Sequence, residues 1–183
     1  FTAPFCALWA AVDHDGRIYI YRQIYRTNRL VEDHCQEILY QCALDPSWPL
    51  AILCDHDAEG RATLKRHLKI QTYPALKAVT RGIEAVSARL RVQGDGLPRL
   101  FVIRDSLVSE DAALKEANKP TCLEEEMAGY VWDPRVNRGD APVKENDHAC
   151  FPAGTKVLTA EGEVEIQNVQ AGTRVRTHLG LAT

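Results

Sequence analysis

The sequence lacks the features that mark membrane and exported proteins. None of its apolar runs approaches the roughly 20 residues that a membrane-spanning helix needs. The N-terminal residues contain no basic stretch followed by an apolar one, which is the pattern of a secretion signal. We therefore expect neither membrane insertion nor export, and we expect a cytosolic protein.

Motifs for ATP and for structural zinc are also missing. No Gly-x-x-x-x-Gly-Lys-Ser/Thr occurs anywhere, so the chain has no P-loop with which to bind ATP. The cysteines are scattered without CxxC or His-ligand spacing, which favours reduced core thiols over a disulfide framework or a zinc site. They are Cys6, Cys35, Cys42, Cys54, Cys122 and Cys150. Only Cys150 stands out, because of the residues around it.

The balance of charge gives no global sign of nucleic-acid binding. The net charge is −3, whereas a duplex-binding surface usually carries clustered lysine and arginine. Two local basic clusters exist, and we favour a solvated helix face over a nucleic-acid surface for them. They are Arg61, Lys65, Arg66, His67 and Lys69, and Arg81, Arg89, Arg91 and Arg99. With 183 residues, 45% of them hydrophobic, the chain suits one medium domain plus an appendage.

The periodicity of apolar residues predicts an α/β domain with a mixed sheet. The apolar run that precedes Asp-His-Asp-Gly (residues 13–16) suits a buried strand, and the alternating segment after it (residues 17–25) together with the Asp-Gly turn is typical of a β-hairpin. Strands and helices then alternate along the chain, which is the pattern of a mixed sheet with flanking helices. We expect a helix over 30–43 with Leu30, Val31, Cys35, Ile38, Leu39 and Cys42 on its apolar face, and a strand over 49–54 covered on both faces. A helix over 58–68 and a strand over 70–74 should follow. We further expect a helix over 79–92 with Ile83, Val86 and Leu90 inward, a buried strand over 100–105, and helices to about Tyr130.

Acidic residues follow the buried strand that we expect over 49–54. Asp55 stands at the end of the strand and Asp57 comes two residues later. Two divalent metals about 4 Å apart need carboxylates from different elements, and strand ends can supply them. The alternative is a solvated loop or a helix cap, which is the ordinary role of Asp-x-Asp after a strand.

Residues 1–149 resemble the nuclease domain of a phage terminase large subunit. The segments that carry the resemblance are FTAPF, the hairpin, LAILCDHDAEGR, LFVIRD, the helix end at Tyr130-Val131-Trp132, and NDHA. The resemblance implies an RNase H-like sheet, with acids that bind Mg²⁺ or Mn²⁺ in a two-metal site. The second family acid matches Asp55, with Asp57 as a nearby alternative, and the third matches Asp147.

Two parts of the family pattern are not in this chain. The first acid normally lies in an Asp-aromatic-Gly motif just before the segment matched by Phe1, and Asp-His-x-x-Asp breaks off after Ala149. We therefore expect a fragment without the first strand of the sheet, with an incomplete metal cluster and no nuclease activity of its own. The resemblance also implies double-stranded phage DNA, the terminase small subunit and the portal protein as partners, in the host cytoplasm.

Residues 150–183 resemble the opening of an intein, which is a self-splicing Hint domain. The resemblance begins at Cys150 with CFPAGT and continues through Val157-Leu158-Thr159, Gly162 and Val164-Glu165-Ile166, in short β-rich segments. It implies that Cys150 is the splicing nucleophile, and that Ala149 and Cys150 form the splice junction after an N-extein of residues 1–149. The family's usual Gly-Asp-x-Val is Gly172-Thr173-Arg174-Val175 here.

Later intein motifs do not occur after Cys150. The Thr-x-x-His motif of the first step and the terminal His-Asn are both absent from 150–183. Three interpretations follow: an inert terminase fragment that carries the start of an intein, the N-terminal half of a split intein that becomes active with its C-terminal half, or a non-catalytic DNA-binding or motor-assembly module.

Overall fold

The computed structural model describes residues 3–54, 58–75, 79–131, 142–143, 145–146 and 148–149, and the backbone of four short strands between 156 and 182. The chain divides into two compact units. The first unit comprises residues 1–12, 17–29 and 86–151, and the second comprises residues 13–16, 30–85 and 152–183. The predicted α/β class with a mixed sheet is confirmed.

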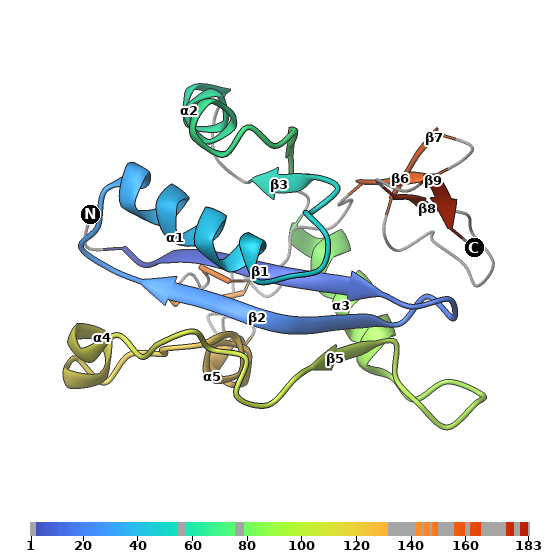
Figure 1. Ribbon diagram of the computed structural model, residues 1–183. Helices are drawn as coiled ribbons and strands as arrows, with labels where there is room; N and C mark the ends of the chain where they lie inside the picture. Colours follow the sequence, from blue (N-terminus) through green and yellow to red (C-terminus); the bar gives the residue numbers. More distant parts are fainter. Residues whose placement is uncertain are drawn as a thin grey trace. The chain divides into compact units, whose positions relative to one another are not determined.

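The first unit is built on a three-stranded mixed sheet in the order β1-β2-β5 (Figure 1). β1 (Phe5–Val12) and β2 (Ile18–Arg26) pair antiparallel, so the predicted hairpin is confirmed. β5 (Leu100–Val102) pairs in parallel with the first residues of β2. The register of the hairpin shifts by one residue between Trp9 and Ala10, which is a β-bulge.

The turn of the hairpin has the chemistry that its sequence predicts. The amide of Gly16 donates to the carbonyl of Asp13 at 3.1 Å, and Gly16 has a φ of 73°. The side chain of Asp13 accepts from the amide of Asp15 at 2.9 Å. Glycine adopts the left-handed conformation without the steric cost of a Cβ, so Asp-Gly suits this tight connection.

β2 is the central strand, and it is buried on both faces. Side chains alternate between the two faces of a strand. The bulge shifts this alternation by one residue, so Ile20, Gln23 and Tyr25, which pair with Ala10, Leu8 and Cys6, share one face and are 0%, 1% and 1% exposed, while Ile24, on the other face, is 3% exposed. The face that carries Gln23 and Tyr25 therefore includes buried polar groups that must find partners.

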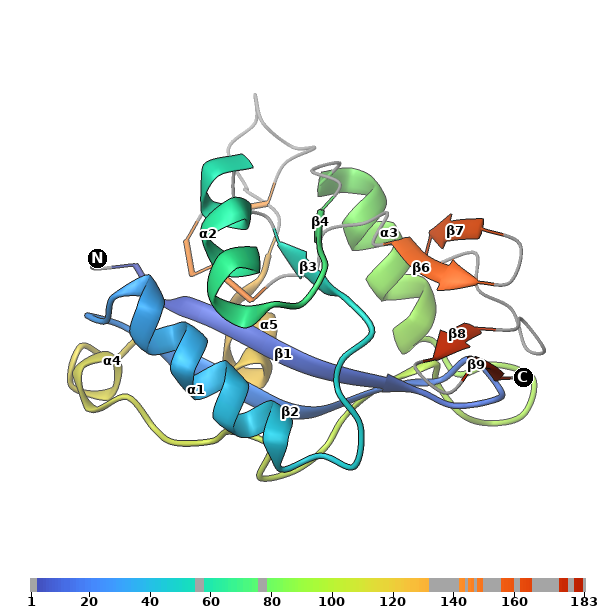
Figure 2. The same cartoon turned by 45° about the horizontal axis from the view of Figure 1, so that its top comes forward.

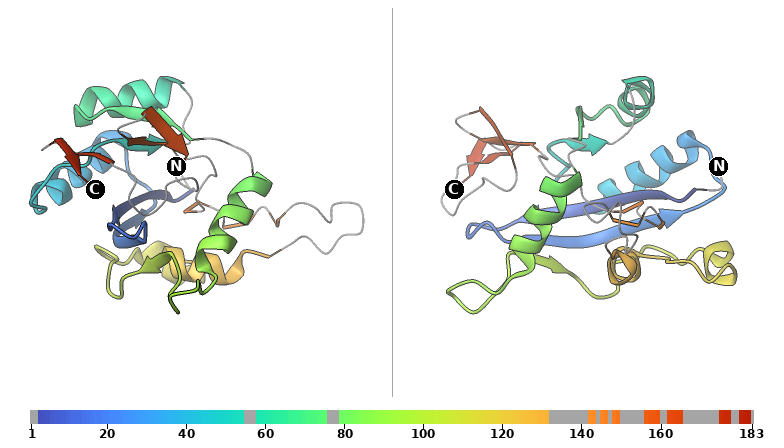
Figure 3. Two further views of the ribbon diagram at one scale, coloured as in Figure 1. Left: turned by 90° about the vertical axis from the view of Figure 1, so that its right-hand side faces the viewer. Right: turned by 180° about the vertical axis from the view of Figure 1, so that it is seen from behind.

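Two short helices complete the first unit. They are α4 (Ala112–Glu116) and α5 (Leu123–Gly129). α5 lies beside β2 on one face of the sheet (Figure 3), and its first residue, Leu123, is 1% exposed. The helix-rich stretch predicted to end near Tyr130 is thus confirmed.

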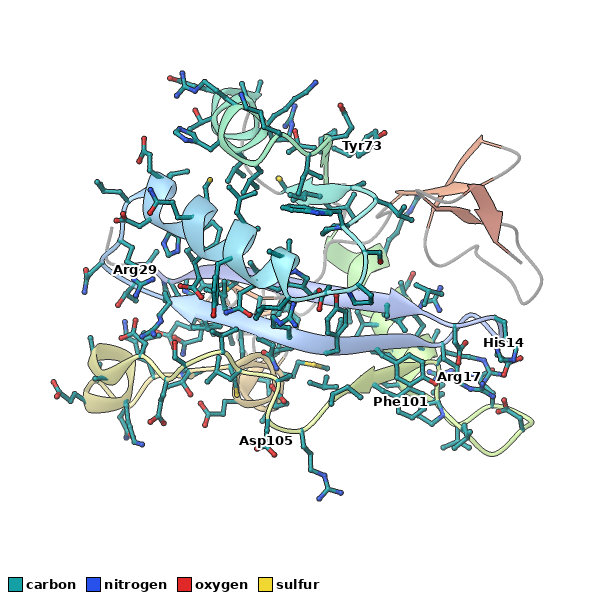
Figure 4. The ribbon with its side chains drawn as sticks, in the orientation of Figure 1. His14, Arg17, Arg29, Tyr73, Phe101 and Asp105 are labelled. Carbon is teal, nitrogen blue, oxygen red and sulfur yellow. The ribbon has the colours of Figure 1, made fainter. Side chains whose placement is uncertain are left out.

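The loop before β5 is held by one carboxylate. Asp95 accepts from Arg99 at 2.8 Å and from Arg17 at 3.0 Å; Figure 4 shows Arg17 near Phe101 of β5. The hydrogen bond from Arg99, with those from the amide of Leu97 and from Arg17, lowers the pKa of Asp95 to about 2. The loop therefore keeps its anchor throughout the neutral and mildly acidic range.

Two glycines of this loop provide a matched test of backbone strain. Gly96 has a φ of +80°, Gly94 does not lie in that region, and a Cβ at either position would meet nothing within 4 Å. We expect Gly96→Ala to lower the free energy of unfolding by about 1 kcal/mol and Gly94→Ala to change it by less than about 0.5 kcal/mol. Urea denaturation of both variants measures this, and equal effects would contradict it.

The second unit contains a β-α-β segment. β3 (Ile52–Cys54) and β4 (Thr72–Pro74) form a two-stranded parallel sheet, and α2 (Ala58–Leu68) connects them (Figure 2). α1 (Val31–Ala43) packs against α2. Its predicted inward residues Cys35, Ile38 and Cys42 are buried. Cys54, at the end of β3, is also buried, as expected of a core thiol.

The described segments beyond residue 155 form a four-stranded antiparallel sheet in the order β7-β6-β8-β9. Its strands are β6 (Lys156–Thr159), β7 (Gly162–Glu165), β8 (Val175–Thr177) and β9 (Gly180–Ala182). None of the helices that the structure describes is long and apolar enough to cross a membrane.

Two expectations about helix ends were wrong. Leu30 is not on the apolar face of α1: it is 64% exposed and extended, with its amide bonded to the side chain of Asp33, so the helix begins one residue later. α3 (Val79–Leu90) ends before Val92, and Leu90 is 46% exposed. The side chain of Gln93 donates to the carbonyls of Ala88 and Arg91 and so satisfies groups at the end of the helix.

Three strands are shorter than predicted, and one of them, β4, begins at Thr72 instead of Ile70. β3 begins at Ile52, and Leu53 is 37% exposed, so the strand is not covered on both faces. Pro49 has no amide to give to a ladder, and the first inter-strand bond runs from Ile52 to Gln71. β5 ends at Val102 instead of continuing to Asp105, where a φ of 58° turns the chain.

Candidate functional site

Most of the residues predicted to carry chemistry lie outside the described residues. These are Asp55, Asp57, Asp147 and Cys150. Their neighbours are described: Cys54 ends β3, His148 is exposed, and Ala149 is 4% exposed. That Asp55 and Asp147 lie close enough to share a metal site therefore remains a prediction. The contacts of Ala149, which precedes Cys150, are described.

The buried polar face of β2 begins at Gln23, whose side-chain amide is fully bonded. Its Nε2 donates to Ser106 Oγ and to Glu124 Oε2, each at 2.8 Å, and its Oε1 accepts from the amide of Leu123 at 2.9 Å. The backbone amide of Gln23 also donates to the carbonyl of Ser106 at 2.7 Å. One side chain thus connects the central strand to the segment after β5 and to the start of α5.

Two residues further along the same face, Tyr25 meets a buried carboxyl group. The hydroxyl of Tyr25 donates to Glu126 Oε2 at 2.6 Å. The other oxygen, Glu126 Oε1, accepts from the amide of Ala149 at 2.6 Å. Glu126 is 1% exposed, so both of its oxygens are used inside the protein. The carboxyl group therefore links the central strand to the residue that precedes Cys150.

The third member of the row is Thr27, which holds the start of α4. Both the amide and the hydroxyl of Thr27 donate to Asp111 Oδ2, at 2.7 and 3.0 Å. Asp111 is the N-cap of α4, and its Oδ1 accepts from the amides of Ala113 and Leu114 at 2.9 and 3.3 Å. One carboxylate thus caps a helix and fixes the end of β2.

Burial raises the pKa of Asp111, but the hydrogen bonds from Thr27, Leu114 and Ala113 outweigh this effect, and the net pKa lies below the ordinary value. A carboxyl group with a depressed folded-state pKa contributes stability above its unfolded pKa of about 3.9. That contribution is lost as the pH falls through the folded pKa.

We expect Asp111→Ala to lower the free energy of unfolding by about 2 kcal/mol near pH 7, because the variant loses a cap and the bonds to Thr27. The difference from the parent chain should shrink as the pH falls below the unfolded pKa of about 3.9 and through the lower folded pKa, because the parent then loses its carboxylate as well. Asp111→Asn keeps an acceptor oxygen, so its loss should be smaller, but it should change with pH by the same amount, because both variants lack the titrating group. Urea denaturation at several pH values measures this; a deficit that is constant with pH would contradict it.

This row of polar residues was not predicted from the sequence. Gln23, Tyr25 and Thr27 have the period-2 spacing of one strand face, which is the available signal. Their partners could not be identified in this way, because Tyr25 and Glu126 are 101 positions apart in the chain.

The arrangement can position a backbone segment, but no metal-binding cluster is found in the part of the chain that the structure describes. Among those residues there is no group of three or more His, Cys, Asp or Glu side chains that could hold a metal ion. The observed geometry is thus that of an anchored backbone segment, in which a buried carboxyl group fixed by Tyr25 holds the amide of Ala149.

Comparison of the chain with protein-family models, with curated proteins and with solved structures finds no match.

Proposed function

We propose that residues 1–149 are a nuclease domain of the phage terminase large-subunit type, and that residues 150–183 open an intein with Cys150 as its nucleophile. The single observation that carries the proposal is the junction, where NDHA of one sequence style meets CFPAGT of another without a linker. The change of structure along the chain supports it. Helices and mixed or parallel strands precede Cys150, and the described strands after it pair antiparallel.

The first chemical step proposed for Cys150 is an acyl shift. The sulfur of Cys150 attacks the carbonyl carbon of Ala149, the Ala149–Cys150 C–N bond breaks, and the nitrogen of Cys150 leaves as an amine that takes up the thiol proton. A thiol suits this step because its thiolate is strongly nucleophilic and later leaves readily in an exchange. An added thiol can then displace the sulfur of Cys150 and release residues 1–149 as a new thioester.

The test uses the 183-residue chain mixed with a second chain that supplies the intein motifs absent from 150–183. Mass spectrometry should detect residues 1–149 as the adduct of the added thiol, together with the released 150–183 segment. A mixture that stays intact at saturating thiol would remove the splicing half of the proposal. Release by the 183-residue chain in the mixture, but not alone, would identify it as the N-terminal half of a split intein.

The nuclease half of the proposal requires divalent metal. Asp55 and Asp147, with Asp57 as an alternative to Asp55, would hold Mg²⁺ or Mn²⁺, because carboxylates are the ligands that these hard cations prefer. The metal would supply activation of water for attack on a phosphodiester of double-stranded DNA. The proposed role of the protein residues is to bind the metal at the ends of strands.

Metal binding can be tested without nuclease activity. We expect Mn²⁺ titration of the 183-residue chain to show binding that weakens at least about tenfold in Asp55→Asn and in Asp147→Asn, because each removes a ligand charge. Glu116→Gln, an exposed change on α4, is the matched loss of one negative charge and should leave the affinity unchanged. Equal affinities in all four proteins would place the metal elsewhere.

A further inference from the structure

The buried carboxyl group of Glu126 is the feature that the proposed function does not use. It is 1% exposed, and among the described residues it makes two contacts that differ in kind. One is to the side chain of Tyr25 on the central strand, and the other is to the backbone amide of Ala149. A buried carboxyl group is costly unless it is hydrogen-bonded, so both contacts are worth more here than they would be on the surface.

The two contacts join parts of the chain that are distant in sequence. Tyr25 and Glu126 are separated by 101 positions, and Glu126 and Ala149 by 23. Tyr25 is 1% exposed and pairs with Cys6 of β1, so it gives Glu126 a rigid support. A hydrogen bond to a backbone amide fixes the position of the chain itself, whatever side chain it carries.

We propose that Glu126 is a positioning residue that anchors the backbone of Ala149 and thereby presents the Ala149–Cys150 peptide bond for attack. This inference rests on the proposed role of Cys150. The anchor belongs to the first 149 residues, so the rate of the first splicing step depends on the folded domain before the junction. Holding the reacting groups in place lowers the barrier by removing conformational freedom before the reaction starts.

The anchor has a readout that does not depend on splicing. The amide hydrogen of Ala149 is buried and bonded, so it should exchange slowly with solvent in the 183-residue chain. We expect Glu126→Ala to speed its exchange at least about tenfold, because the variant removes the acceptor. Glu126→Gln can accept from Ala149 through its amide oxygen and donate to the hydroxyl of Tyr25, so it should restore most of the protection.

Glu125→Ala is the matched control. Glu125 lies on the same helix and its carboxylate accepts from the amide and hydroxyl of Thr121 at 2.7 and 3.0 Å, so its loss also removes two hydrogen bonds. No contact between Glu125 and Ala149 is among the described interactions. The exchange of Ala149 should therefore be unchanged in Glu125→Ala after correction for global stability, which the amide of Ile20 reports. Equal acceleration in both alanine variants would overturn the anchor.

The second readout is thiol-dependent release of residues 1–149 in the mixture with the remaining intein motifs. We expect release to be about tenfold slower in Glu126→Ala, close to the parent rate in Glu126→Gln, and unchanged in Glu125→Ala. If Glu126→Ala matches Glu125→Ala while Cys150→Ala abolishes release, the presenting role of Glu126 is overturned and the proposed function stands. If Cys150→Ala releases residues 1–149 normally, the proposed function fails, and the presenting role fails with it; the exchange of Ala149 still decides the anchor.

Discussion

Replacing Cys150 by alanine is expected to abolish the thiol-dependent release of residues 1–149. A methyl group cannot attack the carbonyl of Ala149, so no thioester forms and an added thiol has nothing to displace. Loss of a covalent nucleophile removes the pathway itself, and we expect at least a thousandfold decrease, on the order of that seen for other covalent nucleophiles. Mass spectrometry of the mixture with the remaining intein motifs, sampled over time, measures the decrease.

Cys122→Ala is the matched control for this experiment. Cys122 is partly buried at the start of α5, and burial raises the pKa of its thiol, so less of the reactive thiolate is present. Its replacement removes one thiol from the first 149 residues without touching the junction, and release should continue at the parent rate. If release persists in Cys150→Ala and is lost in Cys122→Ala, the assignment of the nucleophile to Cys150 is wrong.

Cys150→Ala should leave the first unit folded. The described hydrogen bond that holds Ala149 runs from its own amide to Glu126, so it does not depend on the side chain of residue 150. We therefore expect the slow exchange of the Ala149 amide to survive in Cys150→Ala. The loss of release would then be a loss of chemistry and not of structure, which is the distinction that the experiment needs.

Local features of the chain could be predicted from the sequence. The hairpin follows from Asp-Gly between an apolar run and an alternating segment, and α2 was predicted with its observed bounds, Ala58–Leu68. Both depend on interactions between residues close in sequence, which periodicity and turn chemistry describe. The apolar side of α1 was also predictable at Cys35, Ile38 and Cys42, because helical spacing places them on one face.

Features that depend on distant partners could not be predicted. The lengths of β3 and β5 are set by where their parallel neighbours provide hydrogen bonds, and an apolar run gives no sign of that. The polar face of β2 is another example, because Gln23 is satisfied by residues from 83 to 101 positions away. A glutamine in a strand suggests a buried hydrogen bond, but only the fold identifies its partners.

The candidate site divides in the same way. The motifs around Asp55 and Cys150 could be found in the sequence because they are short and contiguous. The residue proposed to position the junction, Glu126, lies in Leu123–Gly129, where three consecutive glutamates suggest only favourable charge at a helix start. Its role depends on Tyr25 and Ala149, which no sequence pattern connects to it.

Gln23→Leu is expected to lower the free energy of unfolding by about 4 kcal/mol, the largest effect on stability among the variants considered. Leucine preserves the approximate volume but removes every polar atom of the side chain. The amide of Leu123 and the carboxyl group of Glu124 lose their bonds to it, and so does the hydroxyl of Ser106. Each buried polar group left without a partner costs about 1–3 kcal/mol.

Gln71→Leu is the control for Gln23→Leu. Gln71 is exposed, and its Nε2 donates to the carbonyl of Thr72, next to it in the chain, so its replacement should cost less than about 0.5 kcal/mol. Urea denaturation followed by fluorescence compares the two variants. A loss below about 1 kcal/mol in Gln23→Leu would mean that water or rearranged side chains satisfy the freed groups.

A large loss in Gln23→Leu would instead show that the central strand holds the segment after β5 and the start of α5 through one amide. Since α5 also carries Glu126, the variant should then speed exchange at Ala149 as well, which links the stability of this face of the sheet to the geometry of the junction.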